Sequence, residues 1–195
     1  RKFFMHKAKG MVRDVFRTRN MRSLPGNVGL GQVRYPTAGN AYSEEEAQPF
    51  YVNAPFGIVL VHNGNLTNAH ALRAELFSTD HRHTNTDSDS EVLLNVLAHE
   101  IEKSTRGVPL MIDDVFSAVR AVHARIKGSY AVIAMIAGHG VLAFRDPFGI
   151  RPLCLGRSKD GTVMVASESV ALEGTGHEFE RNVAPGEAVF IDLQG

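Results

Sequence analysis

Three short stretches of this sequence carry polar groups whose types would suit one small zwitterionic molecule. Arg34 offers a planar guanidinium fork, which pairs well with a carboxylate, and Asp89 offers an anion for an ammonium group. Asn63 and Gly64 are adjacent, and an Asn amide beside a glycine N–H provides two neutral donors of the kind that stabilise a developing oxyanion. Together the four residues predict a site for an α-amino acid whose side-chain carbonyl is attacked.

The nucleophile is the part of such a site that these residues do not supply. Cys154 is the only cysteine, and it lies between Leu153 and Leu155 in a pattern typical of a strand. No cationic residue adjoins it to lower the pKa of its thiol. We therefore interpret Cys154 as a structural residue.

Two of these positions also have a simpler interpretation. Asn63-Gly64 follows an apolar run over residues 57–61, typical of a buried strand, and precedes Thr67, a suitable helix N-cap. We therefore expect a sharp turn at Asn63-Gly64, which would be a plain strand-to-helix connection. Asp89 is expected in the first turn of a helix, where the helix dipole favours a carboxylate by about 0.3–1 kcal/mol. The same dipole would keep Asp89 ionised for a cationic ligand.

Arg34 is expected at the end of a strand over residues 28–33, whose glycines share one face and would let another backbone come close. Pro36 favours an extended conformation for the residue before it, so a stiff step follows Arg34. The polar, acidic loop over residues 37–46 begins with Thr37 and is long enough to act as a lid.

The remaining periodicity predicts amphipathic helices followed by strands. Helix patterns cover residues 11–21, 67–77 and 114–127, and a Ser-x-x-Glu capping box at Ser88 and Glu91 starts another. Strand patterns cover residues 130–136, 141–144, 150–155, 163–166 and 188–193. Strands, then helices, then strands predict one α+β domain with largely antiparallel sheets and helices on their faces.

Composition excludes several classes of function. Lys+Arg and Asp+Glu both number 21, so the chain lacks the basic surface that a nucleic-acid partner requires. No apolar run approaches the roughly 20 residues of a membrane span. His81 and His83 lack the rigid spacing of zinc motifs, so no metal site is predicted. A single cysteine allows no internal disulfide, which favours a reducing, cytoplasmic location.

The sequence resembles the glutaminase half of the glutamine phosphoribosylpyrophosphate amidotransferases (amidophosphoribosyltransferases), and the resemblance covers nearly the whole chain. The segments that carry it are GQVRYPTAG (31–39), AQPF (47–50), HNGNLTN (62–68), SDSE (88–91), AFRDPFGIRPL (143–153), ASESVAL (166–172) and VAPGE (183–187).

This resemblance implies the four-layer αββα sandwich of the N-terminal-nucleophile hydrolases. It places Arg34 on the α-carboxylate of glutamine, Asp89 on its α-ammonium, Asn63 and Gly64 on the tetrahedral oxyanion, and Thr37 on the loop that closes over the substrate. The implied nucleophile is a cysteine at the mature N-terminus, upstream of Arg1, with its own α-amino group as general base, because a terminal amine has a pKa of about 7.7–8.0.

The resemblance further implies that the released ammonia reacts with phosphoribosylpyrophosphate to give 5-phosphoribosylamine, the first step of de novo purine biosynthesis. That reaction would belong to a phosphoribosyltransferase domain absent from residues 1–195, and Mg²⁺ is expected there rather than as a cofactor of this chain. The family also implies a homo-oligomer.

We interpret both ends of the chain as truncated, and we expect residues 1–195 alone to be inactive because the N-terminal cysteine is missing. Two alternatives are a glutaminase domain of the glucosamine-6-phosphate synthase type and a non-catalytic glutamine-binding module. The first has an Arg-Trp-Ala-Thr-His-Gly motif where this chain has Arg34 to Gly39. The second would lack a Cys-Gly-Ile-type start before Arg1.

Overall fold

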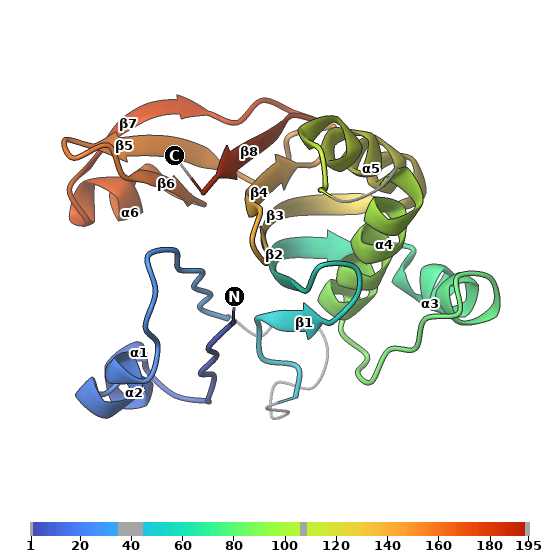
Figure 1. Cartoon of the computed structure of the whole chain (residues 1–195), viewed down its shortest axis with the longest axis horizontal. Coiled ribbons are helices and arrows are strands. Elements are labelled where there is room, and N and C mark those ends of the chain that lie inside the picture. The colour runs from blue at the N-terminus through green and yellow to red at the C-terminus, as the bar shows by residue number, and fades with distance from the viewer. Residues whose placement is uncertain (1, 35–44, 106–108, 194–195) are drawn as a thin grey trace.

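Two antiparallel sheets form the centre of the molecule in the computed structural model, which describes residues 2–34, 45–105 and 109–193 (Figure 1). In spatial order, the five-stranded sheet consists of β1 (Phe50–Val52), β2 (Ile58–Leu66), β3 (Gly128–Ile136), β4 (Gly140–Arg145) and β8 (Ala188–Asp192). The three-stranded sheet consists of β6 (Val163–Ala166), β5 (Cys154–Ser158) and β7 (His177–Asn182).

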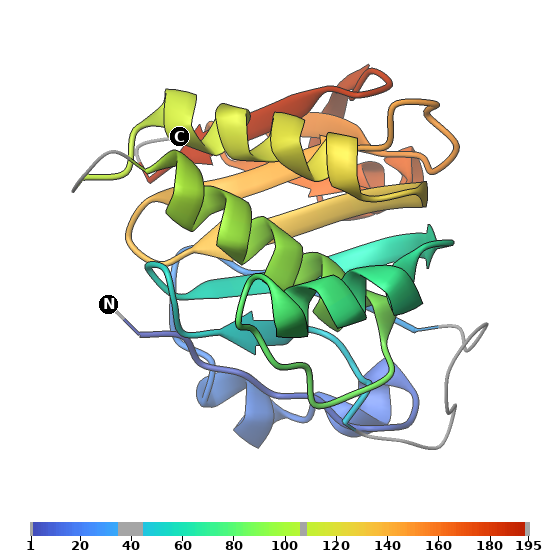
Figure 2. The ribbon, with the colours of Figure 1, turned by 90° about the vertical axis from the view of Figure 1, so that its right-hand side faces the viewer.

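Three helices cover one face of the five-stranded sheet, as Figure 2 shows from the helical side. They are α3 (Ala69–Ser78), α4 (Asp89–Ser104) and α5 (Ile112–Arg125). Side chains alternate between the faces of a strand, and Val132 and Ala134 of β3 accordingly pack with Leu93 and Leu97 of α4 in the main core. Most residues of α4 are buried between the sheet and the neighbouring helices, including the apolar run from Val92 to Leu94 and the polar side chains of Asn95 and Glu100.

The other face of the five-stranded sheet packs against the three-stranded sheet. Ala131 and Ala143 of the larger sheet share a core with Leu153 and Val183, which flank β5 and β7. On the far side of the smaller sheet, α6 (Ser169–Gly174) places Leu172 against Cys154 and Ala166. The layers therefore follow in the order helix, sheet, sheet, helix, which confirms the predicted αββα sandwich.

The N-terminal region differs most from the prediction. The expected helix over residues 11–21 is two short helices, α1 (Val12–Val15) and α2 (Thr18–Arg22), without a buried residue. Residues 28–34 form no strand. A Cβ atom added at Gly29 or Gly31 would meet nothing within 4 Å, so these glycines do not serve a close backbone approach. Within the described ranges no strand pairs with this segment, so its alternation alone does not make it a strand.

The turn predicted at Asn63-Gly64 is also wrong. β2 continues through both residues to Leu66 because β3 pairs with it along its whole length, with Gly64 opposite Tyr130. The helix α3 begins later than predicted, with Asn68 rather than Thr67 at its N-cap. Phe77 at its other end is 68% exposed instead of buried.

Two other local predictions fail because buried carboxylates accept hydrogen bonds from nearby backbone N–H groups. β5 begins at Cys154 and not at residue 150, because residues 147–151 wrap around the buried carboxylate of Asp146, which accepts three hydrogen bonds from their N–H groups. Ser88 is the N-cap of α4, as predicted, but Glu91 accepts from Asn85 and Thr86 and does not complete a capping box.

In the part of the chain that the structure describes, no helix combines the length and the apolar character needed to cross a membrane.

Candidate functional site

The candidate site lies along one edge of β2. β1 is short, and it pairs with β2 only from Phe50 opposite Leu60 to Val52 opposite Ile58. On its other side, β2 pairs with β3 as far as Leu66. Beyond Leu60, therefore, β2 has a strand neighbour on the β3 side and none on the β1 side among the described residues.

The backbone groups of an antiparallel strand point alternately to its two sides. Hydrogen bonds next to the two ends of the β2–β3 ladder join Thr67 to Lys127 and Ala137 to Gly57, so the odd-numbered residues of β2 face β3. The even-numbered residues from His62 to Leu66 therefore direct their N–H and C=O groups to the open side.

Two of the three N–H groups on this open side already have acceptors. The N–H of His62 donates to Oε1 of Gln48 at 2.6 Å, and the N–H of Leu66 donates to Oδ2 of Asp89 at 2.9 Å. Gly64 lies between them, and within residues 2–34, 45–105 and 109–193 no acceptor is found for its N–H. Among the described residues, this edge thus presents a single backbone donor without an acceptor.

The position of that donor requires a glycine. Gly64 has a φ angle of 155°, and an added Cβ atom would clash with the carbonyl oxygen of Ser129 and lie 2.7 Å from Nε2 of His62. Glycine adopts positive φ angles without the steric cost that other residues pay. The strand can keep its pairing with β3 and its open N–H only because residue 64 has no side chain.

Asn63 adds a second donor beside the first. The side chains of Ile58, Leu60 and Leu66 point into the helix-covered core, so the alternation of β2 places the side chain of Asn63 on the opposite face. Asn63 is half-buried, and no described residue forms a hydrogen bond with its amide group. The structure therefore brings together the two neutral donors that the sequence predicts for an oxyanion.

Asp89 is placed next to these donors by the N-terminus of α4. Its carboxylate is the acceptor for Leu66, two residues beyond Gly64, and its side chain keeps 24% of its surface exposed. A carboxylate has more acceptor positions than the one backbone donor of Asp89 fills. Asp89 can therefore both close the end of β2 and accept a cationic group.

Behind the donors lies a buried polar network that the sequence did not reveal. Nδ1 of His62 is 3.1 Å from Oγ of Ser90 and 3.9 Å from Oδ1 of Asp89. Nε2 of Gln48 donates to the carbonyl of His62 at 3.0 Å and to Oγ of Ser90 at 3.1 Å. His62 and Ser90 are both buried. A buried histidine at the end of an apolar run needs a buried partner, but the residue pattern does not show that Gln48 and Ser90 provide it.

Burial keeps His62 neutral. It lowers the pKa of the imidazole below its usual value of 6.5, against the opposing influence of the Asp89 carboxylate and the Ser129 carbonyl. Nε2 of His62 is buried and, among the described residues, meets no atom with hydrogen-bond geometry. The imidazole beside the Asp89 carboxylate is therefore neutral.

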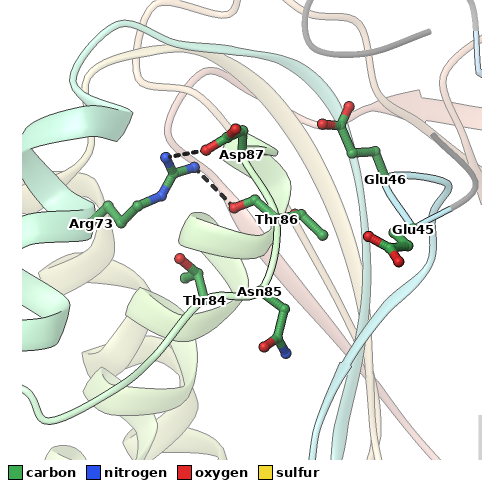
Figure 3. Close-up of a pocket in the computed structure, with 7 residues that line it drawn as sticks. All are labelled: Glu45, Glu46, Arg73, Thr84, Asn85, Thr86 and Asp87. Carbon is green, nitrogen blue, oxygen red and sulfur yellow. Dashed lines mark hydrogen bonds and ion pairs between the residues drawn. The ribbon is translucent and has the colours of Figure 1, made fainter. Parts of the chain in front are cut away.

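Arg34 lies apart from the network around His62, beside Glu46. Its Nη2 forms an ion pair at 3.1 Å with Oε2 of Glu46, whose side chain is largely buried. Glu46 in turn lines an open pocket of about 310 Å³. Figure 3 shows Glu45 and Glu46 on one side of this pocket and Arg73 on the other, beside the loop that leads to Asp89.

The pocket is strongly polar. Arg73 of α3 donates to Oδ1 of Asp87 at 2.9 Å and to the carbonyl of Thr86 at 3.1 Å, which fixes the loop before α4. The structure thus links the surroundings of Arg34 to the start of α4, but it describes no direct contact between Arg34 and Asp89. Thr37 lies outside the described residues. The described residues contain no group of three or more His, Cys, Asp or Glu side chains able to hold a metal ion.

Cys154 does not belong to this site, because it lies in the smaller sheet. Its thiol is buried against α6, on the face of the smaller sheet that points away from the larger one. Sγ donates to the carbonyl of Ala166 at 3.3 Å, and burial raises the pKa of the thiol. The prediction that Cys154 is structural is confirmed by this placement.

Comparison with known proteins matches the glutamine amidotransferase domain family to residues 38–174. The amidophosphoribosyltransferase of Escherichia coli strain K12 is 56% identical over 99% of this chain, and that of Methanocaldococcus jannaschii is 35% identical over 95%. The chain spans only 39% and 37% of the length of these two relatives.

Solved structures agree with the sequence comparison. The glutamine phosphoribosylpyrophosphate amidotransferase of B. subtilis, complexed with ADP and GMP, superposes with a TM-score of 0.78 at 31% identity, over 97% of this chain and 38% of that one. A structure described as the allosteric regulatory enzyme of purine biosynthesis gives a TM-score of 0.80 at 32% identity, with the same coverage.

Proposed function

This chain belongs to the glutamine amidotransferase domain family, and from that premise we propose that it is the glutaminase part of an amidophosphoribosyltransferase. The observation that carries the proposal is the Gly64 N–H at the edge of β2, which has no acceptor in the part of the chain that the structure describes and lies beside the Asn63 amide and the Asp89 carboxylate. The 56% identity to the E. coli amidophosphoribosyltransferase supports this enzyme class over the glucosamine-6-phosphate synthase type.

In the proposed complex, the side-chain carbonyl of glutamine points at the Asn63 amide and the Gly64 N–H. Asp89 accepts the α-ammonium group, and Arg34, oriented by Glu46, pairs with the α-carboxylate. Thr37 belongs to the loop proposed to close over the substrate. With its α-ammonium and α-carboxylate groups both held, glutamine would present its side-chain amide to the two donors in only one orientation.

The reaction begins when a thiolate attacks the amide carbon and the carbonyl π electrons move to oxygen. The two donors stabilise this oxyanion, and they need no charge of their own because they are fixed before the reaction. The tetrahedral intermediate collapses as ammonia leaves with a proton from the general acid, and water then hydrolyses the thioester to glutamate. Cys154 is buried in another layer, and the proposed nucleophile is the one that the family resemblance implies, an N-terminal cysteine upstream of Arg1 with its own amine as base.

The ammonia is proposed to react with phosphoribosylpyrophosphate in a phosphoribosyltransferase domain, as the class name of the relatives indicates. Mg²⁺ would belong to that domain, and we assign it to no residue of this chain. A homo-oligomer and a cytoplasmic location are proposed from the resemblance and from the lone free thiol.

The oxyanion role is tested by Asn63→Ala in the full-length protein. We expect kcat for glutamine hydrolysis to fall by about 10²–10³, with little change in glutamine binding, because the donor acts mainly on the transition state. Asn182→Ala, at an exposed end of β7, is the matched control and should keep kcat. A variant at Asn63 that raises KM and leaves kcat intact would show that the oxyanion role is wrong.

A protein of residues 1–195 alone is predicted to release no ammonia from glutamine, since its one thiol is buried and protonated. The measurement is a coupled ammonia assay on that chain and on its Cys154→Ala variant. Turnover that the Cys154 substitution abolishes would contradict both the proposed nucleophile and the structural role of Cys154.

A further inference from the structure

The side chain of Gln48 occupies the place of a missing strand. β1 pairs Phe50 with Leu60, so a continued ladder would bring residue 48 opposite His62. There the Gln48 amide accepts from the N–H of His62 at 2.6 Å and donates to its carbonyl at 3.0 Å. One primary amide therefore makes the pair of hydrogen bonds that a neighbouring backbone would make.

The same amide is joined to the carboxylate of the site. Nε2 of Gln48 donates to Oγ of Ser90 at 3.1 Å, and Oγ of Ser90 lies 3.4 Å from Oδ1 of Asp89 as its donor. Ser90 is 2% exposed, so no water competes for these bonds. The network connects β2 to the N-terminus of α4 through groups that touch neither Asn63 nor the Gly64 N–H.

This arrangement has a direct consequence for Gly64. Its N–H is the next one along the open side after that of His62, and it has no β1-side partner that would hold it in place among the described residues. Its position is set by the pairing with β3 on one side and by the anchors at His62 and Leu66 on the other. Catalytic donors must be held close to their productive geometry, and a displacement of about 1 Å can cost on the order of 10²-fold in rate.

We propose that Gln48 is a positioning residue of the glutaminase site, which holds β2 at His62 so that the Gly64 N–H stays aimed at the substrate carbonyl. Ser90 extends this action to Asp89, so that the oxyanion donors and the ammonium-binding carboxylate are held as one rigid unit. The inference rests on the proposed function, because it requires the β2 edge to be the site of glutamine hydrolysis.

The test uses Gln48→Glu and Gln48→Met in the full-length protein. The glutamate is isosteric but donates to neither the His62 carbonyl nor Ser90, and methionine keeps the length of the side chain without any hydrogen bond. We expect both variants to lower kcat for glutamine hydrolysis by about 10- to 100-fold, with glutamine binding measured by calorimetry changed less than threefold or so. Retention of kcat within about twofold in both variants would overturn the proposal.

Two further variants separate positioning from general loosening of the sheet edge. Val52→Ala removes packing at the other end of β1 and keeps the Gln48 amide, so it should lower Tm and leave kcat unchanged. Ser90→Ala keeps the anchor at His62 and removes the link to Asp89, so it should raise KM more than it lowers kcat. If Val52→Ala lowers kcat as much as the Gln48 variants at the same loss in Tm, Gln48 has only a structural role.

Asn63→Ala separates a failure of the positioning role of Gln48 from a failure of the proposed function. If kcat falls for Asn63→Ala and persists for the Gln48 variants, the inference about Gln48 is wrong and the proposed function stands. If kcat persists for Asn63→Ala, the oxyanion site itself is wrong, and the inference about Gln48 is overturned with it.

Discussion

At the scale of single residues, the site depends on what Gly64 lacks. The side chains around it supply donors and acceptors, but the open N–H exists because residue 64 can approach Ser129 and His62 without a Cβ atom. The sequence singled out Asn63 and Gly64 from an expected turn, since an Asn-Gly pair indicates a turn, but the pair lies inside a strand. Pairing with β3 overrode the local preference.

Gly64→Ala is therefore expected to abolish glutamine hydrolysis and to destabilise the fold by about 1–3 kcal/mol, because the backbone must move away from the Ser129 carbonyl. Gly174→Ala is the matched control, since a Cβ atom there meets nothing within 4 Å at the end of α6. Urea unfolding and the ammonia assay provide the measurements. A stable and active Gly64→Ala protein would contradict the close approach described here.

Cys154 gives a second prediction at this scale. Its thiol is buried and the pKa is raised by that burial, so the reactive thiolate is scarce and shielded. In native protein at pH 7.5, a thiol reagent should label Cys154 at least tenfold or so more slowly than in urea. Equal labelling rates before and after unfolding would show that the thiol is accessible.

At the scale of elements, a shared cation joins the three helices on the large sheet. Arg125, the last residue of α5, contacts Glu100 of α4 and Glu75 of α3, and its contact with Asp80 just beyond α3 is 2.6 Å. The side chains of Glu100 and Asp80 are only 5% exposed. Removing the cation would leave the buried Glu100 without this charge partner and would leave Asp80 with only His99, whose Nε2 lies 3.4 Å from its Oδ1.

Arg125→Met should accordingly lower the free energy of unfolding by about 3–5 kcal/mol, since an uncompensated buried charge costs more than the lost pair contributed. Arg120→Met, also on α5 but exposed, should change it by less than about 0.5 kcal/mol. Adding Glu100→Gln to Arg125→Met should recover part of the loss. Equal unfolding midpoints for the two arginine variants would contradict this role of Arg125.

The elements that the sequence predicted well are those whose periodicity matches their burial. The helix α4 and the strands β3 and β4 pack on the main core through the residues that the pattern indicates. The expected strand over residues 28–33 failed because alternation alone provides no pairing partner. The strand β1 was missed because three residues carry too little pattern, and it is the shortness of β1 that opens the edge of β2.

At the scale of the whole molecule, the candidate site and the thiol of Cys154 belong to different layers. The β2 edge belongs to the larger sheet, and Cys154 faces α6 beyond the smaller one. The αββα order could be predicted from the resemblance. The network of Gln48, His62 and Ser90 is visible only in the three-dimensional structure. Its three members lie 14 and 28 residues apart along the chain, and no periodicity connects such positions.

The buried His62 and the half-buried His123 make the stability of the whole fold depend on pH. Burial lowers the pKa of both His62 and His123, so the unfolded chain binds protons near pH 6.5 that the folded chain does not. The free energy of unfolding should therefore be maintained above pH 7 and fall as the pH drops below about 6.5, by up to about 1.4 kcal/mol per pH unit for each histidine.

Urea unfolding between pH 8 and pH 5.5 measures this slope. His123→Gln should make it shallower, and His70→Gln, at an exposed position on α3, should leave it as it is. A wild-type stability that rises on acidification through pH 6.5 would show that the sign is wrong.

The open edge of β2 also bears on how the protein avoids aggregation by strand addition. An exposed row of strand N–H and C=O groups is a template on which a second chain can add a strand and begin to aggregate. Here the Gln48 amide covers one end of the row and the Asp89 carboxylate covers the other. The gap between them is one residue long, which is enough for the carbonyl of a small molecule and too short for the ladder of an invading strand.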